Sequence, residues 1–191
     1  MTHPIELNTA RTVQDMRLDN DPKHTNSEVT LASGVYFSWD ADGGDVTLDL
    51  LPKQDVLFAA KVTVQRKPGW LSFNLSLREG SLEAGDILGL VLDFEGCAGE
   101  TLPLFIRSAR SSGMNDTYLQ EPLQGQSSRA VQTLLHTVHG DSALCGPSGF
   151  HTLVFNLPMR DFDFVLHDLR LFVLPAARCL DLGPPRLGKP V

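Results

Sequence analysis

The chain has 191 residues and a formal net charge of -7 at pH 7. Hydrophobic residues make up 42% and charged residues 20% of it, a globular composition that excludes a largely disordered chain. The negative charge repels phosphate backbones and anionic lipid surfaces, so we expect neither nucleic acid nor a membrane as partner. At this length, one domain with a single core is the simplest expectation.

The first 28 residues read as a polar segment. It has neither the basic start nor the apolar run of a secretory signal, and no uncharged apolar run anywhere in the chain approaches the roughly 18 residues of a membrane span. We therefore expect a cytoplasmic protein, or one that is exported without a cleaved N-terminal signal. Within this segment, residues 11–18 could form one polar helical turn or an edge strand.

Strict alternation of apolar and polar residues dominates the chain from residue 35 onward. Leu71, Phe73 and Leu75 alternate with Ser72 and Asn74, the pattern of a strand with one buried and one wet face. With further β-rich runs, about nine strands are predicted, at residues 35–39, 46–50, 56–64, 71–77, 87–94, 102–109, 130–138, 153–157 and 164–174. Glycine-rich segments between them, including residues 96–99 and 113–116, are predicted to be turns.

About nine strands without long helical crossovers imply antiparallel connections. Residues 111–129 and 140–149 look like loops that cross between two sheets. The prediction is therefore an all-β fold, an antiparallel two-sheet β-sandwich of jelly-roll type spanning residues 29–175. Residues 176–191 are rich in proline and glycine and are predicted to be a flexible tail. The core is predicted to contain Phe58, Val62, Leu71, Phe73, Leu75, Leu90, Leu92, Phe155, Leu169 and Leu171.

The usual catalytic signatures are missing from the sequence. It has no nucleophile elbow and no glycine-rich nucleotide loop. His136 and His139 are the only close histidine pair, and residues three apart on a strand point to opposite faces, so we expect no histidine metal centre. Cys97, Cys145 and Cys179 are odd in number and far apart, which indicates free thiols. The chain is not expected to be an enzyme.

The end of the predicted core carries a family resemblance. Residues 162–173 place an aspartate in a run of alternating apolar residues, after a similar run at residues 149–157. This resembles the closing strands of jelly-roll carbohydrate-binding modules and galactose-binding-like sandwiches. The resemblance implies a structural calcium ion held by Asp168, with Glu6 as a conceivable partner. The alternative is that Asp168 only pairs with Arg170 on the same strand.

The same resemblance implies a sugar-binding face with aromatic platforms. Trp70 shares the polar face of its strand with Asn74, where a large ring is unexpected, whereas Trp39 is predicted to be core. The candidate ligand-binding residues are Trp70, Asn74, Arg107 and Tyr118. We expect a non-catalytic module that binds carbohydrate or a glycan-bearing partner. The alternative is a protein–protein interaction or assembly domain, and a homo-oligomer is possible.

Overall fold

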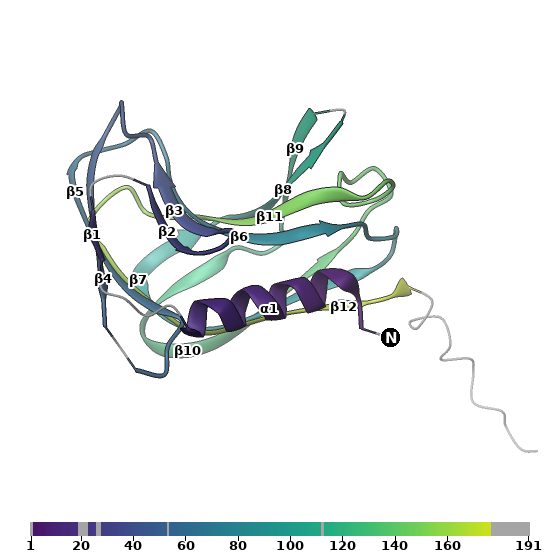
Figure 1. The fold of residues 1–191 in the computed structure, drawn as a ribbon, viewed down its shortest axis with the longest axis horizontal. Helices are drawn as coiled ribbons and strands as arrows, with labels where there is room; N and C mark the ends of the chain where they lie inside the picture. The colour runs from purple at the N-terminus through teal and green to yellow at the C-terminus, as the bar shows by residue number, and fades with distance from the viewer. Residues whose placement is uncertain (1, 19–22, 26–27, 53, 112, 177–191) are drawn as a thin grey trace, which may run out of the picture.

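A computed structural model describes residues 2–18, 23–25, 28–52, 54–111 and 113–176 (Figure 1). Within these ranges twelve strands form two six-stranded sheets, with the orders β1-β4-β5-β12-β7-β10 and β2-β3-β6-β11-β8-β9. All pairings between the named strands are antiparallel, which confirms the predicted two-sheet sandwich. The elements are α1 (Pro4–Leu18), β1 (Lys23–Thr25), β2 (Val29–Ala32), β3 (Val35–Trp39), β4 (Asp45–Leu51), β5 (Phe58–Arg66), β6 (Leu71–Gly80), β7 (Ile87–Leu102), β8 (Leu104–Arg110), β9 (Gly113–Tyr118), β10 (Leu123–Thr137), β11 (Gly149–Asn156) and β12 (Phe162–Leu174).

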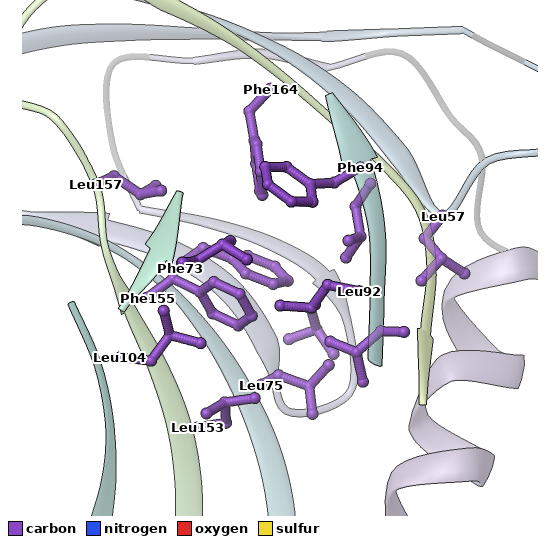
Figure 2. Close-up of a cluster of buried hydrophobic side chains, with 14 of the residues drawn as sticks. Leu57, Phe73, Leu75, Leu92, Phe94, Leu104, Leu153, Phe155, Leu157 and Phe164 are labelled. Atoms are coloured by element: carbon purple, nitrogen blue, oxygen red, sulfur yellow. The ribbon is translucent and has the colours of Figure 1, made fainter. Parts of the chain in front are cut away.

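The core lies between the two sheets, where the apolar faces of the alternating strands meet (Figure 2). All ten predicted core residues are buried, and so is Trp39. Aromatic rings fill the centre of this layer: the Phe73 ring centroid is 5.1 Å from that of Phe37, 4.9 Å from that of Phe58 and 5.3 Å from that of Phe155. Strand alternation alone thus placed the core correctly.

The N-terminal segment differs from its prediction, because it contains the 15-residue helix α1. The buried positions of this helix follow one helical face and are Ile5, Thr9, Thr12, Val13 and Met16. Two of the five are threonines, whose hydroxyls donate to the backbone carbonyls four residues earlier at 2.8 and 3.1 Å. These threonines made the segment look polar. An edge strand is also present, but it is β1, which lies at the edge of its sheet and pairs with β4.

Helix α1 closes one side of the sandwich. It contacts β6 of one sheet and β12 of the other and lies between them in Figure 1. Ile5, Val13 and Met16 belong to the same hydrophobic cluster as the strands. The predicted polar segment therefore contributes apolar side chains to the core.

Two predicted loops are strands. Residues 96–99 do not end a strand but lie within β7, where Gly96 (φ 126°) and Cys97 (φ 51°) interrupt the regular backbone and the register with β10 shifts. A Cβ atom on Gly96 would lie 2.1 Å from the backbone oxygen of Asp163 on β12, so glycine permits this close approach. Residues 111–129 likewise contain β9 and the first part of β10, which accounts for part of the excess over nine strands.

The sheet β2-β3-β6-β11-β8-β9 carries the site described below. Figure 1 shows it curving upward at β3 and at β9, so its outer face is concave. No helix in the described ranges is long and apolar enough to cross a membrane. The predicted tail lies outside the described residues except for Ala176, and Cys179 lies outside them too.

Candidate functional site

A groove of about 390 Å³ lies on the concave face and brings together three of the four predicted ligand-binding residues, Trp70, Asn74 and Arg107. Its lining comes from β3, β6, β11 and β8 and from the turn before β6. The lining residues are Tyr36, Ser38, Trp70, Ser72, Asn74, Phe105, Arg107, Val154 and Asn156.

Strand register explains why these side chains meet. Tyr36 pairs with Asn74, Asn74 with Val154, Val154 with Phe105, and Phe105 with Tyr118. These five residues form one row across five neighbouring strands, and paired residues in antiparallel strands project to the same face. The groove is therefore a direct product of the strand order.

Trp70 is half exposed, with 50% of its surface accessible, and stands at one end of the groove. Asp40, directly after β3, holds the backbone that carries this ring. The Gly69 amide donates to Asp40 Oδ2 at 3.0 Å, and the Asp40 amide donates to the Trp70 carbonyl at 3.1 Å. The Gly43 amide donates to Asp40 Oδ1 at 3.0 Å. One carboxylate thus joins the β3–β4 turn to the turn before β6.

Asn74 forms the polar floor of the groove and is 5% exposed. Its Nδ2 donates to Ser72 Oγ at 3.0 Å, to Ser38 Oγ at 3.2 Å and to the Tyr36 carbonyl at 3.4 Å. Among the described residues no donor reaches its amide oxygen. The side chain is therefore held in one orientation, with an acceptor left for a ligand.

Arg107 lies on β8 at one side of the groove and forms an ion pair with Asp116. Its Nε and Nη2 donate to the two carboxylate oxygens of Asp116, both at 2.8 Å, and its guanidinium lies 5.3 Å from the Phe105 ring centroid. The hydrogen bonds that Arg107 donates to Asp116 raise the pKa of Arg107. Among the described residues that line the groove, Arg107 alone carries a charge, and its partner Asp116 neutralises that charge.

Tyr118, the fourth predicted residue, is not part of the groove lining. It is 59% exposed, and its ring packs at 5.2 Å from that of Phe105. It also lines a separate cavity of about 420 Å³ together with His136 and His139. Tyr118 therefore stands at the rim and supports Phe105 from the side.

Sequence reasoning missed several groove residues, namely Tyr36, Ser38, Ser72, Phe105, Val154 and Asn156. Each lies on the non-core parity of its strand, so alternation already marked it as facing away from the core. The missing information was the order of the strands, which decides which of these outward positions become neighbours. Asp40 was not among the candidate residues, because its role depends on a contact with a second turn 29 residues later.

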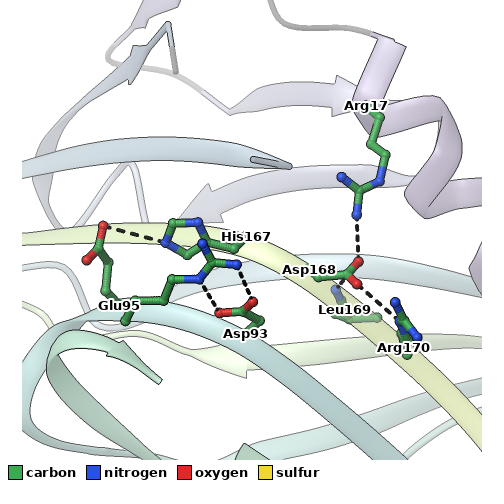
Figure 3. Close-up of polar contacts among 8 residues, drawn as sticks. Arg17, Asp93, Glu95, His167, Asp168, Leu169 and Arg170 are labelled. Carbon is green, nitrogen blue, oxygen red and sulfur yellow. Dashed lines mark hydrogen bonds and ion pairs between the residues drawn. The ribbon is translucent and has the colours of Figure 1, made fainter. Parts of the chain in front are cut away.

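The two predicted calcium ligands, Glu6 and Asp168, line a cavity between α1 and β12. Figure 3 shows Asp168 and its contacts. Asp168 Oδ1 accepts from Arg17 at 2.7 Å and Oδ2 accepts from Arg170 at 3.1 Å, so the alternative pairing with Arg170 is present. Glu6 accepts from the Val173 amide through Oε1 and from the amide of His3 through Oε2, both at 2.9 Å.

These contacts do not fit a calcium site, which needs six to eight oxygen ligands. Every carboxylate oxygen of Asp168 and Glu6 already accepts a hydrogen bond. No group of three or more His, Cys, Asp or Glu in the described part of the chain could hold a metal ion. Calcium binding at Asp168 stays a prediction, and the ion would have to displace two guanidinium groups.

The described cysteines are free thiols, as predicted. Burial raises the pKa of Cys97 to about 12, and burial also raises the pKa of Cys145. Both thiols are therefore protonated at neutral pH, unlike a nucleophilic thiolate. Ser108 and His151 are in contact at 2.9 Å between Oγ and Nδ1, but they are only 1% and 0% exposed. That pair joins strands inside the core, where no substrate can reach it.

Comparison with known proteins supports the fold. No protein-family model matches the chain, and no curated protein sequence matches it. The Stig cyclase Fisc from Fischerella sp. TAU aligns over 92% of this chain and 98% of its own, with 13% identity and a TM-score of 0.51. A CBM4 carbohydrate-binding module aligns over 73% and 87%, with 12% identity and a TM-score of 0.50.

A third similar structure aligns more loosely. The CBM22-1 xylan-binding domain of Xyn10C from Paenibacillus barcinonensis covers 69% of this chain and 83% of its own, with 12% identity and a TM-score of 0.45. At these identities the similarity concerns the fold alone. The chain therefore has a jelly-roll sandwich fold, similar to the folds of the CBM4 module and of the Stig cyclase.

Proposed function

We propose that the chain is a non-catalytic binding module whose ligand is a neutral carbohydrate, free or carried by a partner, held in the concave groove beside Trp70. The observation that carries this proposal is the half-exposed Trp70 ring at the end of a groove with a polar floor. A half-exposed tryptophan ring gives the groove a large, rigid apolar surface on which a ligand can stack.

The chemistry of the groove matches both surfaces of a sugar ring. A pyranose presents apolar C–H groups on its faces and hydroxyl groups at its rim. Trp70 provides an aromatic surface for the C–H groups, and Asn74, Asn156 and the serines provide donors and acceptors for the hydroxyls. Hydroxyl recognition by fixed amides is selective because an unmatched buried amide costs free energy.

Electrostatics favours an uncharged ligand. The single charged residue of the groove, Arg107, is paired bidentately with Asp116, and the whole chain carries a net charge of -7. An anionic polysaccharide would meet an unfavourable overall potential with no unpaired cation in the groove to compensate for it. We therefore expect neutral glycans to bind in preference to sulfated or uronic ones.

The test is calorimetric binding of neutral oligosaccharides to the unmodified chain and to Trp70→Ala. The expected result is a loss of affinity of about tenfold or more, equivalent to roughly 1.4 kcal/mol, because the stacking surface is removed. The matched control is Phe150→Ala, since Phe150 is 46% exposed on the same sheet but outside the groove lining. Equal losses in both variants, or no binding by the unmodified chain, would refute the proposal.

A second candidate function is assembly with protein, and the observation behind it is strand β10. In the described part of the chain β10 pairs with β7 alone and forms a sheet edge. Val131 is 64% and Leu135 is 49% exposed, and residues 130–137 contain none of the lysines or prolines that usually protect an edge. Size-exclusion chromatography with light scattering tests this function: a dimer that Val131→Lys converts to a monomer would support it.

A further inference from the structure

A second cavity adjoins the groove at Trp70. It has a volume of about 350 Å³, close to the 390 Å³ of the groove, and the two cavities share Trp70 and Asn156 in their lining. Its other lining residues come from the turn before β6 and the first residue of β6, from the end of β7 with Pro103, and from the segment after β11. Trp70 therefore stands between two hollows of similar size.

The two cavities follow one direction along the strands. On β6 the groove uses Asn74, then Ser72, then Trp70 just before the strand begins. Alternate residues on one strand face are about 6.6 Å apart, so this path is about 13 Å long. On β11 the path passes Val154 and Asn156, and the second cavity continues from Asn156 into the following segment. The two hollows therefore form one elongated surface.

The second cavity has the same kind of lining as the groove. Pro103, Pro158 and Met159 provide apolar surface next to the Trp70 ring, and Thr101 provides a hydroxyl. Glu100 lines the cavity as well, and its carboxylate forms an ion pair with Arg160. As in the groove, the charge in the lining is already balanced, which again suits an uncharged ligand.

We infer that this cavity is a second sugar subsite and that the ligand is a linear, neutral oligosaccharide that lies on both sides of Trp70. This inference rests on the proposed function and adds the length of the ligand to it. A monosaccharide or disaccharide is held in the groove, and only a longer chain reaches past Trp70 into the second cavity. Affinity must therefore increase with chain length.

The experiment measures binding of neutral oligosaccharides from the disaccharide to the hexasaccharide by calorimetry. Thr101→Arg fills the second cavity from an exposed strand position without altering the groove. The matched control is Thr133→Arg, because Thr133 is also exposed on a strand of the same sheet as Thr101 but lines neither cavity. Both variants add the same charge and the same bulk. Melting curves verify that each is folded, and Met159→Ala serves as a second cavity variant.

The unmodified chain should bind the hexasaccharide about tenfold or more tightly than the disaccharide. Thr101→Arg should remove this advantage and leave disaccharide binding unchanged, Met159→Ala should reduce the advantage, and Thr133→Arg should behave like the unmodified chain. Length-independent binding that still needs Trp70 would overturn this inference and leave the proposed function standing. Equal losses at all lengths in Thr101→Arg would overturn it too. Absence of any glycan binding would overturn both.

Discussion

Asp40 shows how one side chain positions a functional surface without contacting a ligand. Its carboxylate accepts hydrogen bonds from the amides of Gly43 and Gly69, and its own amide donates a hydrogen bond to the Trp70 carbonyl. The backbone of both glycines lies very close to the Asp40 carboxylate: a Cβ atom would lie 2.9 Å from Asp40 Oδ2 on Gly69 and 2.0 Å from it on Gly43. The two glycines are thus required by the contact, and the Trp70 backbone is held from both sides.

Replacing Asp40 by alanine should increase the mobility of the Trp70 backbone and side chain. We expect faster motion of the Trp70 indole and a several-fold loss of glycan affinity, since the ring is no longer fixed before the ligand arrives. Each lost hydrogen bond to this carboxylate should also cost up to about 1.5–3 kcal/mol of stability. The measurement is the NMR line width of the indole N–H signals, with the buried Trp39 as internal reference. Asp42→Ala in the same turn is the control, and equal signals in both variants would refute the role of Asp40.

Inside the core, Phe73 is a central packing residue. It is 0% exposed and its ring contacts three other phenylalanine rings. Phe73→Ala should lower the free energy of unfolding by roughly 3–5 kcal/mol, because it removes apolar surface and leaves a cavity in a packed layer. Urea unfolding measures this change. A value within experimental error of the unmodified chain would mean that this ring is not part of the packed centre.

At the scale of elements, α1 is the part of the fold that a hydrophobic pattern describes least well. Its buried face includes two threonines, and their hydroxyls are satisfied by the helix itself. Three polar contacts attach it to the sheets: Glu6 to the Val173 amide, Asn8 to the Glu79 carbonyl, and Arg17 to Asp168. The helix is therefore an integral side wall of the sandwich.

Helix α1 should consequently contribute to global stability through its buried residues. Met16 is 1% exposed, and Met16→Ala should cost about 2–5 kcal/mol. Leu18, two residues later, is 81% exposed, and Leu18→Ala should change stability by no more than about 0.5 kcal/mol. Chemical unfolding of both variants gives the comparison. Similar small effects would show that the helix is not docked in solution.

Calcium binding belongs to the same interface and has its own test. Calcium that binds only the folded chain raises the melting temperature, since ligand binding adds about 2.7 kcal/mol of stability at a hundredfold excess over Kd. The calcium hypothesis requires a higher melting temperature in millimolar calcium than in chelator, and it requires that Asp168→Ala abolish this difference. Identical curves for the unmodified chain would exclude the ion. Because Arg17 and Arg170 occupy this carboxylate, Arg17→Ala should strengthen any calcium effect.

For the whole molecule, buried histidines make stability depend on pH. Burial lowers the pKa of His136 and of His151 below the usual value of about 6.5. Below about pH 6.5 these histidines bind protons in the unfolded chain but remain neutral in the folded chain. The free energy of unfolding therefore falls as the pH falls towards the pKa values of the folded state. Above about pH 7 both states are neutral at these residues and the dependence disappears.

We therefore expect urea unfolding to give a lower stability at about pH 5.5 than at about pH 7.5. His136→Leu should reduce the slope between these values, because one histidine contributes up to about 1.4 kcal/mol per pH unit. The unfolding measurements stay above about pH 5, because carboxylates titrate at lower pH. Arg129, for example, lowers the pKa of Asp93, so that this ion pair is lost only in stronger acid. A flat profile would contradict the burial of these histidines.

The sequence by itself determined the properties that depend on neighbouring residues along the chain. Alternation in residues 71–77 identified a strand, assigned Phe73 to the core and set Trp70 on the opposite face, because successive strand residues point to opposite sides of a sheet. The same local rule underlies the ten core residues that the structure confirms. It did not detect α1, because threonines stand where a helix usually shows apolar residues.

Only the tertiary structure decided which outward-facing residues become neighbours. The order β3-β6-β11-β8 places Tyr36, Asn74, Val154 and Phe105 in one row, although they are far apart in the chain. It also brings Asn156 beside Trp70 and so joins two cavities. The order of the strands depends on how the whole core packs. The side of the sheet to which a residue points depends only on the local backbone, and sequence periodicity reveals only that side.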